Sequence, residues 1–174
     1  MRIGTRRNTG GTDLPPVELP PIAVVSCHGG CGATTVARLL GPAGREVQRD
    51  ALAVRDEVLV MVARGTARGM QWATEGVRVA YEHIRRGWLA EPPVLVVVAD
   101  SPLREPSVVR ARLRLLQDRV RGIVHMPYVS QWREVDDPLS LPVPAGVCAS
   151  MAHLSSLLSP SPSPVLELEE ERAP

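Results

Sequence analysis

Short apolar runs and segments with helical periodicity alternate along this chain. Apolar, strand-like runs occur at residues 22–26, 58–63, 94–99 and 122–126, and the run at 58–63 is continuously apolar, which is typical of a buried parallel strand. Segments with apolar residues at helical spacing occur between or beside them, at residues 34–40, 67–87 and 107–120. Strands that alternate with helices in this way predict an α/β fold, with a short, open, mostly parallel sheet of about four strands and flanking helices.

The two ends of the chain have a different composition from the middle. Residues 1–21 are rich in Gly, Thr, Arg and Pro and predict a disordered leader before an α/β domain at 22–135. A Pro-rich segment follows at 136–158, where we expect a short helix from residue 146. The last residues, 159–174, have the sequence SPSPSPVLELEEERAP and predict a disordered acidic tail.

Composition narrows the classes of function. All 20 basic residues are arginines, because the chain contains no lysine, and the net charge is only +1. This balance gives no nucleic-acid signature, so nucleic acid and membrane surfaces are not the favoured partners. No apolar run is long enough to span a membrane, and three cysteines give no disulfide framework. We therefore expect a cytoplasmic protein.

The most specific motif is the sequence CHGGCGATT at residues 27–35, which lies between the first predicted strand and the first predicted helix. Glycines at these spacings let backbone N–H groups approach a phosphate, and the helix that follows adds its N-terminal N–H groups. The strand, loop and helix together are the setting that a phosphate-binding loop requires. The candidate nucleotide or phosphate site therefore comprises Gly29, Gly30, Cys31, Gly32, Ala33, Thr34 and Thr35.

These residues resemble the loop of the ParA/MinD group of P-loop ATPases, which has the form KGGxGKTT. Both lysines of that pattern are replaced, the first by His28 and the second by Ala33. Two later segments resemble strands of the same group, VLVVVADSP with Asp100 near the position that contacts the base and GIVHMPYVSQWRE with Pro127 near the adenine. The resemblance implies a P-loop NTPase-like fold that binds ATP or GTP, with Thr34 as the Mg²⁺ ligand.

The resemblance is incomplete in ways that argue against hydrolysis. A P-loop NTPase uses its lysine on the phosphates, and no other lysine is present to replace it. The polar segment 41–56 is also too short for the two strands that carry the switch aspartate and the Mg-proximal aspartate in that group. We therefore expect a degenerate Walker A loop in a pseudo-ATPase, with no catalytic residues and no resident metal.

The loop is also similar to that of small actinobacterial proteins that keep a Gly-Gly-x-Gly-x-Ser/Thr-Thr pattern, some of which accompany conjugative elements. This association gives a context and implies no mechanism. We expect a non-catalytic binding or regulatory module that works with a protein partner in a plasmid or conjugation-type assembly, with a homodimer as a further option. One alternative is a weak ATPase or GTPase that a partner's lysine completes. Another is that the loop persists only as a tight turn between strand and helix.

Several single residues allow two interpretations. Arg64, at the end of the second predicted strand, either replaces the missing lysine charge or pairs with an acid. Asp100 either accepts from a base N–H or caps the loop that precedes Pro102. Thr34 is a natural N-cap type for the first predicted helix.

Arginines crowd the predicted helix at 107–120 and its flanks, and this cluster predicts a polyanion-binding surface as a third alternative. Its members are Arg104, Arg110, Arg112, Arg114, Arg119 and Arg121. Of these, Arg110, Arg114 and Arg121 are expected to share a face. The acidic tail would then compete for this surface within the same chain.

Two smaller clusters have weaker support. Cys27, His28 and Cys31 offer three zinc ligands within five residues, but a structural zinc site needs four. Trp132 and Arg133 lie outside the predicted elements, where they either form a protein interface or close the edge of the sheet.

Overall fold

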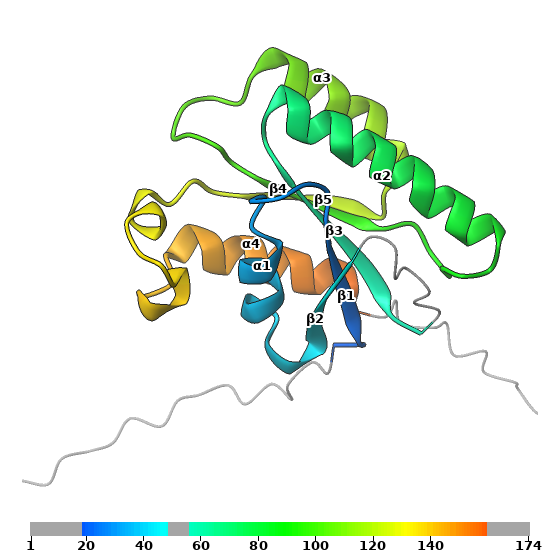
Figure 1. The fold of residues 1–174 in the computed structure, drawn as a ribbon, viewed down its shortest axis with the longest axis horizontal. Coiled ribbons are helices and arrows are strands. Elements are labelled where there is room, and N and C mark those ends of the chain that lie inside the picture. Colours follow the sequence, from blue (N-terminus) through cyan, green and yellow to red (C-terminus); the bar gives the residue numbers. More distant parts are fainter. Residues whose placement is uncertain (1–18, 49–55, 160–174) are drawn as a thin grey trace, which may run out of the picture.

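The computed structural model describes residues 19–48 and 56–159, and its centre is a sheet of five parallel strands in the order β2-β1-β3-β4-β5 (Figure 1). The strands are β1 (Ile22–Ser26), β2 (Gly44–Val47), β3 (Val58–Arg64), β4 (Val94–Val98) and β5 (Gly122–Met126). The predicted α/β class with a parallel sheet is confirmed. Most of the predicted leader and nearly all of the predicted acidic tail lie outside the described residues.

The predicted number of strands is wrong by one, because the polar segment 41–56 contains β2. This strand pairs with β1 from Ile22 opposite Gly44 to Val25 opposite Val47. It is an edge strand, and of its four residues only Val47 is buried. An edge strand with one buried residue lacks the continuous apolar run by which the other strands are recognised.

Within residues 19–48 and 56–159, four α-helices cover the two faces of the sheet and make a three-layer structure (Figure 1). They are α1 (Ala33–Leu39), α2 (Ala67–Arg85), α3 (Ser107–Leu116) and α4 (Ala145–Leu158). Helices α2 and α3 pack on one face, and α1 and α4 pack on the other. Among the described residues, no helix is both long and apolar enough to cross a lipid bilayer.

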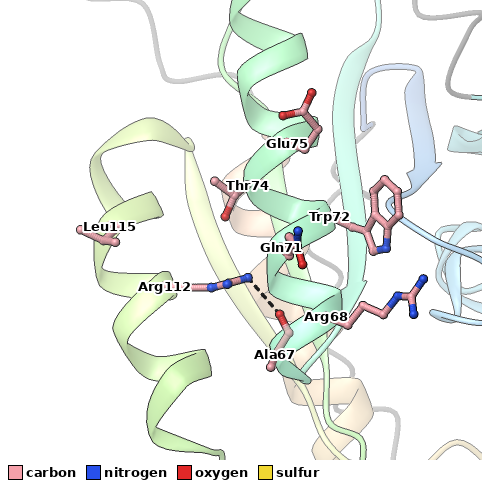
Figure 2. Close-up of a pocket in the computed structure, with 8 residues that line it drawn as sticks. All are labelled: Ala67, Arg68, Gln71, Trp72, Thr74, Glu75, Arg112 and Leu115. Atoms are coloured by element: carbon pink, nitrogen blue, oxygen red, sulfur yellow. Dashed lines mark hydrogen bonds between the residues drawn. The ribbon is translucent and has the colours of Figure 1, made fainter.

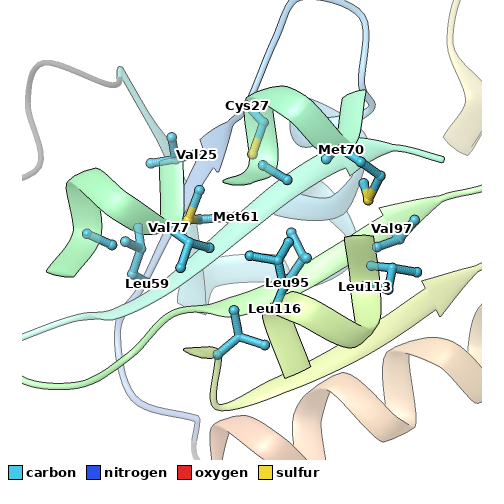
Figure 3. Close-up of a cluster of buried hydrophobic side chains, with 14 of the residues drawn as sticks. Val25, Cys27, Leu59, Met61, Met70, Val77, Leu95, Val97, Leu113 and Leu116 are labelled. Atoms are coloured by element: carbon cyan, nitrogen blue, oxygen red, sulfur yellow. The ribbon is translucent and has the colours of Figure 1, made fainter. Parts of the chain in front are cut away.

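The core is aliphatic and lies on both faces of the sheet, because successive strand residues point to opposite sides. On the face under α2 and α3, Val25, Met61 and Leu95 of three adjacent strands pack against Met70 and Val77 of α2 (Figure 3). On the other face, alternate residues of the same strands pack against α1 and α4. Among the described residues, no polar or charged residue is classed as buried.

Helix α4 comes from the Pro-rich segment 136–158. It begins at Ala145, one residue before the predicted start, and it buries Val147, Leu154 and Leu158 against the sheet. Two 3-10 turns, Ser130–Arg133 and Pro138–Ser140, lead from β5 to this helix. The chain after residue 135 therefore contributes to the same core as the strands.

Two helix boundaries differ from the predictions. Helix α1 begins at Ala33 with Gly32 as its N-cap, so the predicted start at Thr34 is wrong by one residue. Helix α3 ends at Leu116 and continues as a 3-10 turn, so Arg121 does not share a helix face with Arg110 and Arg114. Arg121 instead pairs with Glu91, with 2.8 Å between the guanidinium and the carboxylate.

Candidate functional site

The candidate site lies where the strand order reverses. From β1 the chain turns through α1 to β2 on one side, and from β3 it turns through α2 to β4 on the other side. The helices that follow β1 and β3 therefore leave toward opposite faces, and the carboxyl ends of these two strands border a crevice. Doubly wound α/β proteins bind their ligands in this kind of crevice.

The loop after β1 has the backbone conformation that its glycines predict. Gly30 and Gly32 have φ angles of 71° and 97°, in the left-handed region that other residues rarely adopt. Gly32 is also the N-cap of α1, and no side chain of the described residues caps that helix. The first N–H groups of α1 thus have no side-chain acceptor.

Arg64, the last residue of β3, lies against this loop. Its Nη2 donates to the carbonyl oxygen of Gly30 at 2.6 Å, and its Nε lies 3.9 Å from Oδ1 of Asp100. The side chain is only 24% exposed, so it is held between the loop and the end of β4. The predicted pairing of Arg64 with an acid is therefore present, and its guanidinium also contacts the loop.

His28 ties the loop to β3. Its Nε2 accepts a hydrogen bond from the backbone N–H of Arg64 at 3.2 Å, and its Nδ1 lies 3.0 Å from the carbonyl oxygen of Gly29. Because Nε2 accepts, the ring hydrogen belongs on Nδ1 in this arrangement. His28 occupies the position of the first lysine in the ParA/MinD pattern, but its ring is used to hold the loop.

Thr34, which the resemblance implies is a Mg²⁺ ligand, contacts a carboxylate of β2, the strand that was not predicted. Its hydroxyl donates to Oε2 of Glu46 at 2.7 Å, and both side chains are exposed. Mg²⁺ takes oxygen ligands and commonly combines one or two carboxylates with phosphate oxygens. The pair fits that donor set, although no group of three His, Cys, Asp or Glu side chains in the described part of the chain would hold a metal alone.

Asp100 and Pro127 follow β4 and β5 at the same edge of the sheet. Oδ1 of Asp100 lies 3.2 Å from Nη2 of Arg133, which also stacks over Tyr128 with 5.3 Å to the ring centroid. Asp100 thus lies between two arginines, and the turn before Leu103 is instead bonded by the hydroxyl of Ser101. The carboxylate of Asp100, which the resemblance implies lies near the base, contacts the guanidinium groups of Arg133 and Arg64 in the structure.

Trp132 precedes Arg133 and packs against the core on the α1 and α4 side. Its indole N–H is a buried donor with no hydrogen-bond partner among the described residues. The tryptophan therefore contributes to the core on that face of the sheet.

The thiols of the loop do not converge. Cys27 is buried in the core beneath α2, whereas Cys31 is buried in the core beside α1, on the opposite face of the sheet. Sγ of Cys31 lies 3.2 Å from the hydroxyl of Ser26. Both thiols therefore have packing roles on different faces, a geometry that does not suit a shared zinc ion.

A cleft of about 480 Å³ opens beside the loop, between Cys27–Gly29 and the first two turns of α2. Helix α2 approaches closely because Gly69 has no side chain, since a Cβ there would overlap the carbonyl oxygen of Arg64. The lining side chains include Thr66, Arg68 and Trp72. The cleft adjoins the predicted phosphate loop at Gly29, while Asp100 and Pro127 do not line it.

A larger groove of about 970 Å³ is lined by residues of α2 and by Arg112 and Leu115 of α3, and Arg68 and Trp72 line both this groove and the cleft (Figure 2). Arg112 of the predicted arginine cluster reaches across it and donates to the carbonyl oxygen of Ala67 at 3.0 Å. Arg112 therefore joins two helices, and Arg121 is held by Glu91. The predicted arginine surface is thus partly used for packing contacts.

Sequence reasoning missed Glu46, Arg68 and Trp72. Glu46 lies in a segment that was expected to contain no strand. Arg68 and Trp72 are four residues apart, the spacing that places two side chains on one helix face, and this spacing could have indicated a common wall. What the sequence did not show was that this face of α2 borders the glycine loop.

No protein-family profile, curated protein or solved structure matches this chain. The similarity to the ParA/MinD loop thus remains a prediction from the loop residues, and the site rests on its own geometry.

Proposed function

We propose that this protein is a non-catalytic binding module whose P-loop-like glycine loop holds the phosphate groups of a ligand, with ATP or GTP and Mg²⁺ as the candidates. The observation that carries the proposal is the contact between Arg64 and the loop. A guanidinium that donates to the carbonyl oxygen of Gly30 at 2.6 Å brings a full positive charge to a loop without lysine.

The loop supports phosphate binding through its backbone. Two glycines in the left-handed conformation precede a helix start without a side-chain cap, and backbone N–H groups in such loops attract anions. Hydrogen bonds from charged donors are roughly twice as strong as neutral ones. The charge of Arg64 therefore replaces part of the phosphate-binding free energy that a loop lysine would supply.

Binding without turnover is the expected behaviour. Thr34 and Glu46 would hold Mg²⁺ against the phosphates, and the ion would neutralise phosphate charge there. The chain offers no lysine for the transferred phosphoryl group, and arginine is held at the loop by a backbone carbonyl and an acid. A module of this kind acts as a ligand-dependent regulator of a protein partner.

The test uses two arginines that share one neighbour. Arg64 and Arg133 both lie beside Asp100, but Arg64 also donates to the loop. We expect Arg64→Gln to weaken tripolyphosphate and ATP binding at least tenfold, the effect of losing one charged hydrogen bond of about 1.5–3 kcal/mol. The matched variant Arg133→Gln should keep the affinity of the natural protein.

Titration calorimetry with and without Mg²⁺ measures these affinities, and a phosphate-release assay on the same samples measures turnover. Equal affinities in the two variants would contradict the role of Arg64. Steady phosphate release by the purified protein would show that it is an enzyme and would overturn the non-catalytic assignment.

A further inference from the structure

The side chains that line the cleft beside the loop include a cation and an aromatic ring but no acid. Cys27, His28 and Gly29 form one wall, and Thr66, Arg68, Gly69 and Trp72 form the other. This lining contains one cation and one indole and no carboxylate. A ligand that matches it is both planar and anionic.

The polar groups of the lining present hydrogen-bond donors to the cleft. Oγ1 of Thr66 accepts from the backbone N–H of Gly69 at 3.0 Å, so the hydroxyl hydrogen is left to donate. Arg68 carries only donors. His28 uses both ring nitrogens within the protein, which makes its ring a wall of the cleft.

Trp72 supplies the planar surface. It lies one turn after Arg68 on α2 and is 37% exposed. Figure 2 shows both side chains on the side of α2 that faces away from α3. The indole and the guanidinium therefore border the same space, opposite Gly29 of the glycine loop.

We propose that this cleft is a nucleobase subsite, so that the ligand of the loop is a nucleoside phosphate whose base packs on Trp72 while Arg68 and Thr66 donate to its sugar-phosphate part. The inference rests on the proposed binding of phosphate by the loop. A volume of about 480 Å³ lies within the range of small-molecule sites, about 300–1,000 Å³.

The same assignment moves the base away from the position that the ParA/MinD resemblance implies. Asp100 and Pro127 do not line the cleft, and the carboxylate of Asp100 is engaged by Arg133. Stacking on an indole accepts any base, because every base has a π face. ATP and GTP should therefore bind with similar affinity.

The test compares ligands that share the phosphates and differ in the base. Calorimetry is run with ATP, GTP and inorganic tripolyphosphate on the full chain, on Trp72→Ala and on Trp88→Ala. Trp88 is 40% exposed and stacks with Arg86 beyond the end of α2, so its removal is a matched control for loss of an exposed indole. Thermal unfolding checks that each variant is folded.

We expect both nucleotides to bind roughly tenfold more tightly than tripolyphosphate, the usual contribution of one stacked base. Trp72→Ala should abolish this preference and leave tripolyphosphate affinity unchanged, and Trp88→Ala should preserve it. Equal affinity for nucleotide and tripolyphosphate in the natural protein, or a preference that survives Trp72→Ala, would overturn the subsite while phosphate binding stands. If tripolyphosphate itself does not bind, the proposed function fails and the subsite fails with it.

Fluorescence gives a second readout that does not depend on truncating the side chain. Nucleotide should quench indole emission in the natural protein and in Trp88→Phe, and Trp72→Phe should lose the quenching while it keeps most of the affinity. Quenching that persists in Trp72→Phe would contradict the assignment.

Discussion

At the level of single residues, two glycines show how the loop depends on backbone conformation. Gly30 and Gly87 have φ angles of 71° and 69°, and a Cβ on either would meet nothing within 4 Å. Alanine at either position should therefore cost the same free energy of unfolding, about 1 kcal/mol, because the left-handed conformation is the only penalty.

Chemical denaturation of Gly30→Ala and Gly87→Ala measures these two losses. Only Gly30→Ala should also weaken phosphate binding, since Gly87 lies just beyond α2, far along the chain from the loop. A much larger loss of stability at Gly30 than at Gly87 would show that the loop makes contacts besides those described.

The ion pair between Arg38 of α1 and Asp137 gives a prediction about pH. Two hydrogen bonds of 2.7 and 3.0 Å join the guanidinium to the carboxylate, and these bonds hold the pKa of Asp137 below its ordinary value of 3.8. A lowered carboxyl pKa adds stability that is complete above the ordinary value and is lost as the pH falls through the lowered one.

NMR titration of the Asp137 carboxyl checks this directly. We expect its pKa to rise toward the ordinary value in Arg38→Gln, and the acid-side loss of stability to become smaller. The pair is exposed, so the effect on the free energy of unfolding should be small near neutral pH. An unchanged pKa in the variant would show that the pair does not persist in solution.

At the level of secondary structure, the buried strands were predictable and the edge strand was not. β1 and β5 have the predicted boundaries, because their mostly apolar residues stand out between polar loops. β2 buries only Val47, and it can be recognised as a strand by its pairing with β1 but not by its own residues. Tyr81 of α2 and Trp88 beyond the end of this helix are both exposed, because the residues that α2 buries are Gly69, Met70, Ala73, Val77 and Ala80.

Two glycines of α2 test how closely this helix approaches the site. A Cβ on Gly69 would overlap the carbonyl oxygen of Arg64 and lie 3.1 Å from Nε2 of His28. A Cβ on Gly76 would overlap only Cε of Met61, the far end of an unbranched side chain.

Gly69→Ala should therefore destabilise the protein by roughly 2–3 kcal/mol, because a backbone carbonyl is forced to move. Gly76→Ala should stay within about 1 kcal/mol of the natural protein, since the gain in helix propensity offsets the shift of Met61. Urea denaturation of both variants measures these losses in the free energy of unfolding. A loss at Gly69 no larger than the loss at Gly76 would show that the fold does not require the close approach of α2.

The site was predictable only in part, because its members come from three places in the chain. The glycine loop and Arg64 follow from local sequence, since each comes at the end of an apolar strand. Glu46 and Trp72 join the loop only because β2 and β3 flank β1 on its two sides. That strand order is a property of the whole sheet, and no short segment reveals it.

At the scale of the whole molecule, the candidate site lies at the carboxyl ends of β1 and β3, the two strands between which the strand order reverses. β1 and β3 pair along their length, and the backbone N–H of Cys27 continues this pairing by donating to the carbonyl oxygen of Val62 at 2.9 Å. The loop and the start of α2 are therefore supported by adjacent rigid strands, which lets exposed backbone N–H groups keep one orientation for a ligand.

The most direct test places a charge in the loop without disturbing its backbone. Gly29 is exposed, has no left-handed φ, and a Cβ there would meet nothing within 4 Å. Gly29→Asp and Gly29→Asn are nearly equal in shape and differ by one negative charge. Calorimetric titration with ATP and Mg²⁺ should show sub-millimolar binding to the natural protein, which Gly29→Asn retains and Gly29→Asp loses. No heat from the natural protein at millimolar ATP, or equal binding by the two variants, would contradict phosphate binding at this loop.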